Sequence, residues 1–126
     1  MTSITYACYY LGRLNLSIAL PALAVALNVS RAEIGILGTV FFWTYGLGQF
    51  FVGEIGNIVR PRLLITLGLT ITLFINLIFS FQTMLPIMAV LWGINGVGQA
   101  MGWSPIARIL GDHLTPPQRG RVAATF

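Results

Sequence analysis

Residues Tyr6 to Leu27, YACYYLGRLNLSIALPALAVAL, form an apolar run that carries one charged residue, Arg13, near its middle. About 20 apolar residues, each rising roughly 1.5 Å along a helix, cross the roughly 30 Å hydrocarbon core of a bilayer. The run therefore predicts a transmembrane helix. An arginine at this depth costs about 2.5 to 3.5 kcal/mol on insertion scales and normally faces a wet cavity or a partner. We expect Arg13 to mark an anion-binding site; the alternative is a structural arginine that pairs with neighbouring carbonyls.

Helical spacing places further polar residues beside Arg13. Tyr6, Tyr10, Arg13 and Ser17 follow i, i+4, i+7, i+11 spacing, so they share one stripe of the predicted helix. Two phenols beside a guanidinium offer hydrogen-bond donors and ring faces to an anionic ligand. The alternative for the tyrosines is anchoring at the membrane surface, where this residue type is enriched.

The composition places the chain among membrane proteins. Of 126 residues, 56% are hydrophobic and only 8% are charged, which excludes an ordinary soluble domain. The cationic residues do not cluster on a solvated face, so we expect no nucleic-acid partner. Cys8 is the single cysteine, which excludes a disulfide framework and a cysteine zinc site. We find no metal-ligand cluster, catalytic carboxylate pair or nucleophile with a base, and therefore expect neither an enzyme nor a cofactor.

Polar breaks divide the chain into helices. We predict an all-α membrane protein with transmembrane helices at about 4–27, 31–54, 63–81 and 85–110, and the start of a fifth helix at 120–126. Ser30 followed by Glu33 fits a capping box, which begins the second helix near Arg31. Pro61 disfavours helical geometry at Arg60, which places a turn before the third helix. Because the last apolar run begins and stops at once, we expect a truncated chain.

The arginines in the turns predict an orientation. The turn after the second helix carries Arg60 and Arg62, the turn after the fourth carries Arg119 and Arg121, and the other two turns hold only Arg31. Cytoplasmic loops carry the excess of cationic residues in membrane proteins. We therefore expect a multi-pass protein of the plasma membrane with a cytoplasmic N-terminus.

A known family shares the pattern of the loop between the second and third helices. The segment Gly53 to Arg62 resembles the signature loop of the major facilitator superfamily, Gly-x-x-x-Asp-Arg-x-Gly-Arg-Arg. Gly53, Arg60 and Arg62 are in place, and Asn57 replaces the aspartate. This replacement removes the charge that the family uses as a conformational latch.

Two further segments carry the resemblance along the whole chain. Tyr9 to Pro21 is similar to the first helix of the organic-anion branches of the superfamily. Gly98 to Arg108, with the following Gln118-Arg119-Gly120, resembles the end of the fourth helix and the loop after it. The resemblance implies that this chain is the N-terminal part of a twelve-helix secondary transporter. Its expected partners are the missing C-terminal helices of the same transporter and the lipid bilayer.

Two branches of the superfamily compete. In organophosphate:phosphate antiporters the first-helix arginine binds phosphate. That branch commonly has a lysine where this chain has Gln49. It can also have a lysine directly after the arginine, where this chain has Leu14. Proton-coupled organic-anion symporters commonly have a proton-carrying glutamate at position 99, where Gln99 cannot titrate. The antiporter branch has a glutamine there, followed by Gly-Trp as in Gly102-Trp103. We therefore favour the antiporter branch.

The resemblance implies alternating-access transport of a small organic anion, an organophosphate or a carboxylate, bound at mid-membrane by Arg13. One alternative is a membrane sensor on the same fold, in which anion binding signals to a partner. Another is a non-functional truncated protein or a small oligomeric four-helix membrane protein. The residues expected to bind or flank the substrate are Arg13, Tyr10, Tyr6, Asn15, Gln49 and Gln99, with no catalytic residue.

Overall fold

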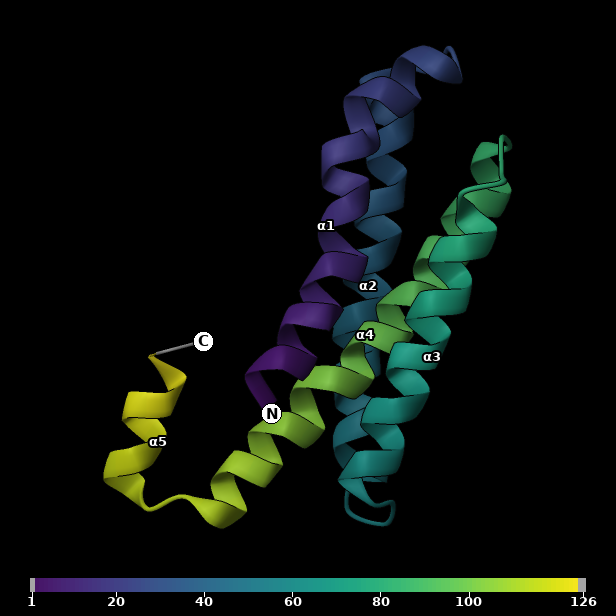
Figure 1. Ribbon diagram of the computed structural model, residues 1–126. Helices are drawn as coiled ribbons and strands as arrows, with labels where there is room; N and C mark the ends of the chain where they lie inside the picture. Colours follow the sequence, from purple (N-terminus) through teal and green to yellow (C-terminus); the bar gives the residue numbers. More distant parts are fainter. Residues whose placement is uncertain (1, 125–126) are drawn as a thin grey trace.

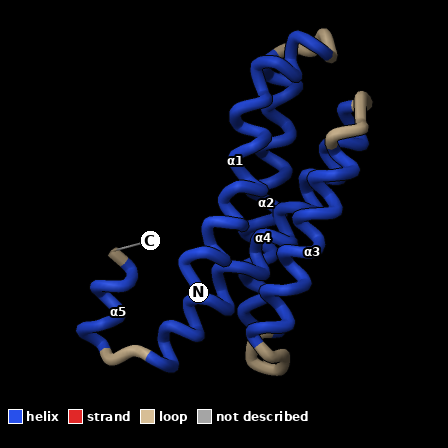
Figure 2. Tube along the Cα trace, in the orientation of Figure 1, coloured by secondary structure: helices blue, strands red, loops and turns tan. Residues whose placement is uncertain are grey.

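The computed structural model describes residues 2–124, apart from the side chains of residues 2 and 123, and is built from helices joined by short turns (Figure 1, Figure 2). The helices are α1 (Thr2–Ala26), α2 (Arg31–Ile55), α3 (Pro61–Phe79), α4 (Leu85–His113) and α5 (Pro116–Ala123). Segments of three of them, Ser3–Ala26, Arg31–Ile55 and Pro61–Phe79, are long and apolar enough to cross a membrane. The chain is therefore an all-α membrane protein.

The capping box expected at the start of α2 is present. The Glu33 amide donates a hydrogen bond to Ser30 Oγ at 3.2 Å, and the Ser30 amide donates to Glu33 Oε2 at 2.8 Å. These two bonds satisfy backbone donors that have no partner inside the helix. The helix consequently begins at Arg31.

Several helix ends differ from the sequence-based expectation, and prolines account for two of the differences. Pro61 is the first residue of α3 because a proline needs no amide partner there, so α3 begins two residues earlier than expected and ends at Phe79. Pro116 starts α5 in the same way, with a Thr115–Gln118 capping box, although the fifth helix was expected to start at residue 120. Residues 125–126 of that expected helix lie outside the described part. α4 also continues through Pro105 to His113, three residues past the expected end.

Helix α4 lies between α2 and α3 and forms the centre of the bundle (Figure 1). Glycines permit this close packing. A Cβ atom at Gly96 would lie 2.8 Å from the carbonyl oxygen of Phe41 on α2, and one at Gly98 would lie 3.0 Å from Cγ2 of Ile71 on α3. Small residues serve membrane helices in this way because they let two backbones approach.

Helix α2 uses few of its glycines for packing against the other described helices. A Cβ atom at Gly48 would lie 2.9 Å from Cβ of Ala100, whereas Cβ atoms at Gly35, Gly38 and Gly46 would meet no described atom within 4 Å. The main apolar cluster instead joins α1, α2 and α4 through larger side chains. Its buried members are Leu16, Ile34, Leu37, Phe41, Met88 and Trp92.

Tyr9 attaches α1 to the other helices. Its side chain is only 3% exposed, and its hydroxyl donates a hydrogen bond to the Ile65 carbonyl on α3 at 2.8 Å. A Cβ atom at Gly102 of α4 would lie 2.8 Å from the Tyr9 ring, and Gln99 Nε2 donates to the Tyr9 carbonyl at 2.9 Å. Tyr9 therefore fixes α1 against both neighbours at one level of the bundle.

Candidate anion-binding site

Arg13 lies against aromatic rings of α2. Its guanidinium carbon is over the rings of Phe41 and Phe42, 5.3 Å from each centroid, and over the ring of Tyr45 at 5.5 Å. Each distance is within the roughly 6 Å at which a cation is attracted by the negative face of a ring. The three ring contacts therefore help to offset the cost of holding a cation in a partly buried position.

The acidic side chains lie elsewhere. Glu33 is engaged in the capping box at the start of α2, and Asp112 forms an ion pair with Arg108 at 3.9 Å. Across residues 2–124, no carboxylate oxygen lies within 4.0 Å of a nitrogen of Arg13. The positive charge of Arg13 is therefore not neutralised by a neighbouring side chain, and it can attract an anion.

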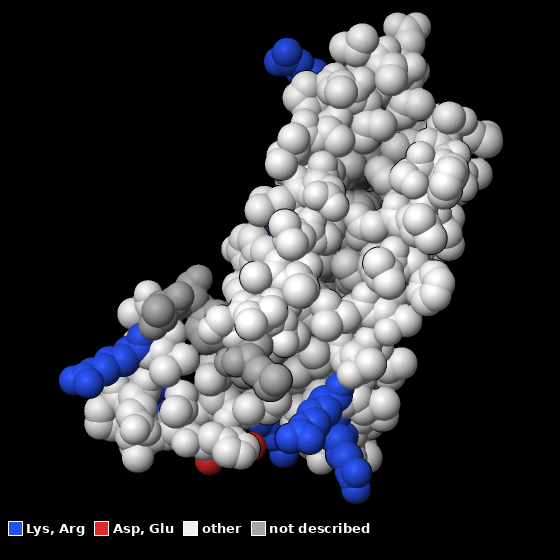
Figure 3. Space-filling model, viewed as in Figure 1, with Lys and Arg blue, Asp and Glu red and all other residues white. Residues whose placement is uncertain are grey.

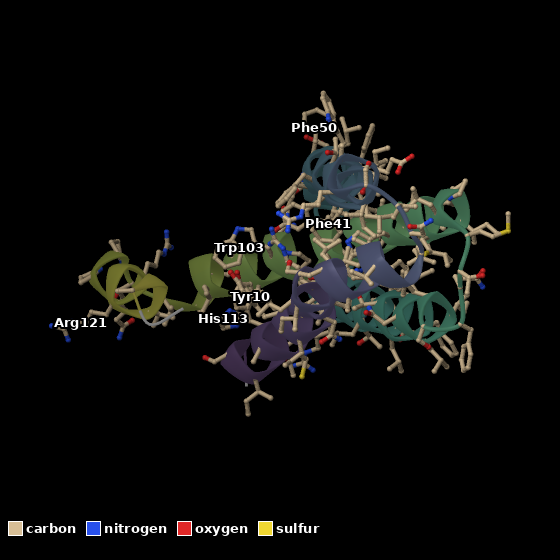
Figure 4. All side chains as sticks on the ribbon, turned by 90° about the horizontal axis from the view of Figure 1, so that it is seen from above. Tyr10, Phe41, Phe50, Trp103, His113 and Arg121 are labelled. Atoms are coloured by element: carbon tan, nitrogen blue, oxygen red, sulfur yellow. The ribbon has the colours of Figure 1, made fainter. Side chains whose placement is uncertain are left out.

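Three aromatic side chains extend the site from Arg13 toward the N-terminal end of α1. The Tyr6 ring centroid lies 5.2 Å from that of Tyr10 and 5.4 Å from that of Trp103 on α4. Figure 4 shows Tyr10 and Trp103 on one side of the bundle, while Phe50 points away from it on the far side of α2. The phenols and the indole provide hydrogen-bond donors together with apolar ring surface.

These side chains enclose a small cavity between α1, α2 and α4. Its volume is about 10 Å³, which is room for roughly one water molecule. Tyr10 and Trp103 on its rim are 42% and 39% exposed, so the cavity has accessible walls. The cavity is lined by Tyr6, Tyr9, Tyr10, Arg13, Tyr45, Gln99 and Trp103.

The structure brings four of the residues expected at the site to this cavity: Tyr6, Tyr10, Arg13 and Gln99. Gln99 is buried, and its amide nitrogen is engaged by the Tyr9 carbonyl, which leaves its side-chain oxygen as the group able to accept a further bond.

The other two expected residues do not line the cavity. Asn15 lines a separate groove of about 300 Å³ with Asn76 and Trp92. The reason is helical geometry, since two residues after Arg13 correspond to a rotation of about 200° around the axis. Gln49 lies on α2, one turn beyond Tyr45, and its Nε2 atom is buried without a hydrogen-bond partner.

Sequence reasoning did not assign Tyr9, Tyr45 or Trp103 to the site. A usable signal was present, because Tyr45 follows Phe41 and Trp103 follows Gln99 by four residues, which places each pair on one helix face. The contact of Tyr45 with Arg13, however, depends on how α1 packs against α2, and no pattern within one helix contains that information.

The loop between α2 and α3 is tied to α4. Arg108 Nη1 donates a hydrogen bond to Asn57 Oδ1 at 3.3 Å and a second one to the Gly56 carbonyl. A Cβ atom at Gly53 would lie 4.0 Å from Ser104 Oγ, so this end of α2 also approaches α4. Arg60 and Arg62 are exposed beside the turn. The loop motif is thus joined to α4 through Arg108.

Comparison with known proteins gives consistent matches. The Major Facilitator Superfamily domain matches residues 2–126. A "Probable hexose phosphate transport protein" of Chlamydia trachomatis is 34% identical over 91% of this chain and 25% of that protein. The "Membrane sensor protein UhpC" of Escherichia coli is 35% identical over 91% of this chain and 26% of that protein.

A "Glycerol-3-phosphate transporter" of Haemophilus influenzae is 31% identical over 96% of this chain and 26% of that protein. The chain spans about a quarter of the length of the curated relatives it matches. A search of solved structures found no significant match.

Proposed function

The chain belongs to the Major Facilitator Superfamily, and from this premise we propose that it is the N-terminal part of a secondary transporter for a small organic anion. Such a carrier exposes a central site alternately to each side of the membrane by rocking one helical half against the other. In this proposal α1, α2 and α4 contribute the cavity, and further helices provide the facing half. An enzymatic role is not proposed, because the family and the relatives are carriers or a sensor.

The substrate class we propose is a phosphate ester. Relatives named as transporters of hexose phosphate, glycerol 3-phosphate and phosphoglycerate support this class. The single observation that carries the proposal is Arg13, a guanidinium that lines the cavity without a carboxylate within 4.0 Å in the described part of the chain. A guanidinium can bind a phosphate group through two parallel hydrogen bonds, and the phenols of Tyr6 and Tyr10 can donate further ones.

Exchange of one anion for another fits the site better than proton coupling. Proton coupling requires a titratable group within the membrane. Gln99 occupies the cavity position where an acid would serve that purpose, and its amide does not titrate. An unneutralised Arg13 is costly to move across a low-dielectric region while the site is empty, and a bound anion lowers that cost. We therefore propose an antiporter.

We place the carrier in the plasma membrane with its N-terminus in the cytoplasm. Figure 3 supports the orientation, because the basic atoms on this face gather mainly at the end of the molecule where the α2–α3 turn and α5 lie. Cytoplasmic loops are the ones enriched in arginine and lysine. Asn15 and Gln49 remain proposed as residues that flank the pathway, and the loop residues Gly53, Asn57, Arg60 and Arg62 as part of the conformational machinery.

The proposal is tested by exchange of radioactive inorganic phosphate against a sugar phosphate in liposomes that contain the complete protein to which this chain belongs. Arg13→Gln should reduce exchange at least 100-fold. Arg31→Gln, which changes an exposed arginine at the start of α2 outside the cavity, is the matched control and should leave most exchange intact. Full exchange in Arg13→Gln, or transport of a sugar carboxylate without any phosphate ester, would contradict the proposed substrate class.

A sensor is the second candidate function, and the 35% identity to a protein named as a membrane sensor favours keeping it. A sensor and a carrier both bind the anion, but only a carrier moves it across the membrane. Binding of a sugar phosphate to the purified protein without measurable exchange in liposomes would therefore support the sensor.

A further inference from the structure

Beyond the site itself, we infer that three ring-bearing residues of α2, Phe41, Phe42 and Tyr45, position Arg13 for anion binding. We call them the α2 ring set. The inference rests on the proposed function, in which Arg13 binds the anion. The new element is that uncharged rings, with no carboxylate among them, hold the guanidinium in place, and that Phe42 is the member whose effect can be measured separately.

All three rings of the α2 ring set lie close to the guanidinium of Arg13. The three centroids lie 5.3, 5.3 and 5.5 Å from the guanidinium carbon, and all three rings come from a single turn of α2. Phe41 and Tyr45 are nearly parallel, with an interplanar angle of 8°, and Phe42 meets Phe41 edge to face at 82°. The guanidinium therefore has ring surface on more than one side.

Rings and carboxylates stabilise a cation with different consequences for a ligand. A carboxylate would cancel the charge of Arg13, and an incoming anion would have to displace it. A ring attracts the cation through its quadrupole and carries no net charge. The α2 ring set consequently reduces the cost of burying Arg13 and leaves its positive charge available to the anion.

Contact with the rings does not remove Arg13 from the cavity. The guanidinium is planar and carries five N–H donors in its plane. Arg13 lines the cavity at the same time as it contacts the rings. Contact with the rings restrains the position of the group, so that less conformational freedom is lost when an anion binds.

The three rings differ in their burial and in their contacts with residues other than Arg13. Phe41 is 3% exposed and packs against Trp92 at 5.8 Å, so its replacement would disturb the core. Tyr45 lines the cavity itself. Phe42 is 61% exposed, and within residues 2–124 its ring contacts are Phe41 and the guanidinium of Arg13. Phe42 can therefore be changed with little effect on the core.

The experiment replaces Phe42 in the complete protein by 4-fluoro-, 3,5-difluoro- and 3,4,5-trifluorophenylalanine. Each fluorine withdraws electron density from the ring face with little change in size. The dissociation constant for inorganic phosphate is measured by calorimetry on the purified protein. We expect it to rise with every added fluorine, by roughly 3- to 10-fold in total, the size of a partly exposed cation–ring contact.

Phe50 provides the matched control. It lies on the same helix, is 71% exposed, and contacts Phe51 at 5.7 Å instead of Arg13. The same fluorinated series at position 50 should leave the dissociation constant unchanged. A flat or falling series at position 42, or equal slopes at both positions, would overturn the inference.

Two further variants separate this inference from the proposed function. Phe42→Glu should abolish phosphate binding because it gives Arg13 a competing carboxylate, whereas Phe50→Glu should not. Arg13→Gln tests the proposed function independently of any ring. If the wild-type protein binds phosphate, Arg13→Gln does not, and the fluorinated series is flat, only the role of the α2 ring set fails. If Arg13→Gln binds as the wild-type protein does, the proposed function fails.

Discussion

Arg108 on α4 donates a hydrogen bond to the side-chain oxygen of Asn57 at 3.3 Å and so joins α4 to the turn between α2 and α3. The same guanidinium binds the Gly56 carbonyl next to the end of α2 and lies 3.9 Å from Asp112. A cation at the C-terminal end of a helix interacts favourably with the carbonyl groups that lack a partner there. One exposed arginine thus connects two segments that are separated by about fifty residues of sequence.

Changing Asn57 to Asp should strengthen this connection. The neutral acceptor would become a charged one opposite Arg108, and an exposed pair of this kind contributes about 0.2 to 1 kcal/mol. The free energy of unfolding in mixed micelles should rise by that amount at low salt and return to the wild-type value at high salt. A double-mutant cycle with Arg108→Gln is the control. An equal gain in the absence of Arg108 would contradict the pairing.

Changing Gly96 to Ala should destabilise the protein. The added Cβ atom would lie 2.8 Å from the Phe41 carbonyl oxygen, which belongs to a helix backbone and cannot turn aside. Forced overpacking of this kind costs about 1 to 3 kcal/mol. Gly46→Ala is the control, because a Cβ atom there meets no described atom within 4 Å and alanine favours the helix. Thermal unfolding should therefore shift downward for the first variant only.

Changing Tyr9 to Phe should cost about 1 kcal/mol of unfolding free energy, because it removes the 2.8 Å hydrogen bond from the hydroxyl to the Ile65 carbonyl. The ring would keep its place beside Gly102. Tyr10→Phe is the control, since Tyr10 is 42% exposed. Equal stability of the two variants would show that the hydrogen bond of the Tyr9 hydroxyl does not stabilise the fold.

Changing Trp103 to Ala should affect a phosphate ester more than inorganic phosphate. Trp103 lines the cavity with ring surface and lies 5.4 Å from Tyr6, whereas Arg13 supplies the charge. We expect the KM for a sugar phosphate to rise about tenfold, the loss of one aromatic ring contact, while the dissociation constant of inorganic phosphate changes less than about twofold. An equal rise in the KM for the sugar phosphate and in the dissociation constant of inorganic phosphate would show that Trp103 supports Arg13 and does not contact the organic part of the ester.

The sequence predicted those features that depend on one helix at a time. Tyr6, Tyr10 and Arg13 meet at one cavity because their spacing places them on one face of α1, and the start of α2 follows from Ser30 and Glu33. The family was identified from other local motifs, chiefly the loop Gly53 to Arg62, and the comparisons confirm it.

Features that depend on packing between helices were not predicted. The rings over Arg13 come from α2, and their distance from α1 follows from the way the two helices pack, which no single periodicity describes. Asn15 was expected to bind or flank the substrate from the resemblance of the first helix, and the helix carries it to a groove separate from the cavity. The early start of α5 was missed, although proline is compatible with a first helical turn.

Tyr9 has a consequence for any attempt to alter the substrate range. Its carbonyl and its hydroxyl are both engaged, by α4 and α3, and it lies in sequence between Tyr6 and Tyr10. A substitution that removed its ring and hydroxyl would weaken the packing that holds the cavity residues of α1 against α3 and α4. A mutant library that varies the cavity should therefore keep position 9 constant, so that each variant reports on one side chain at a time.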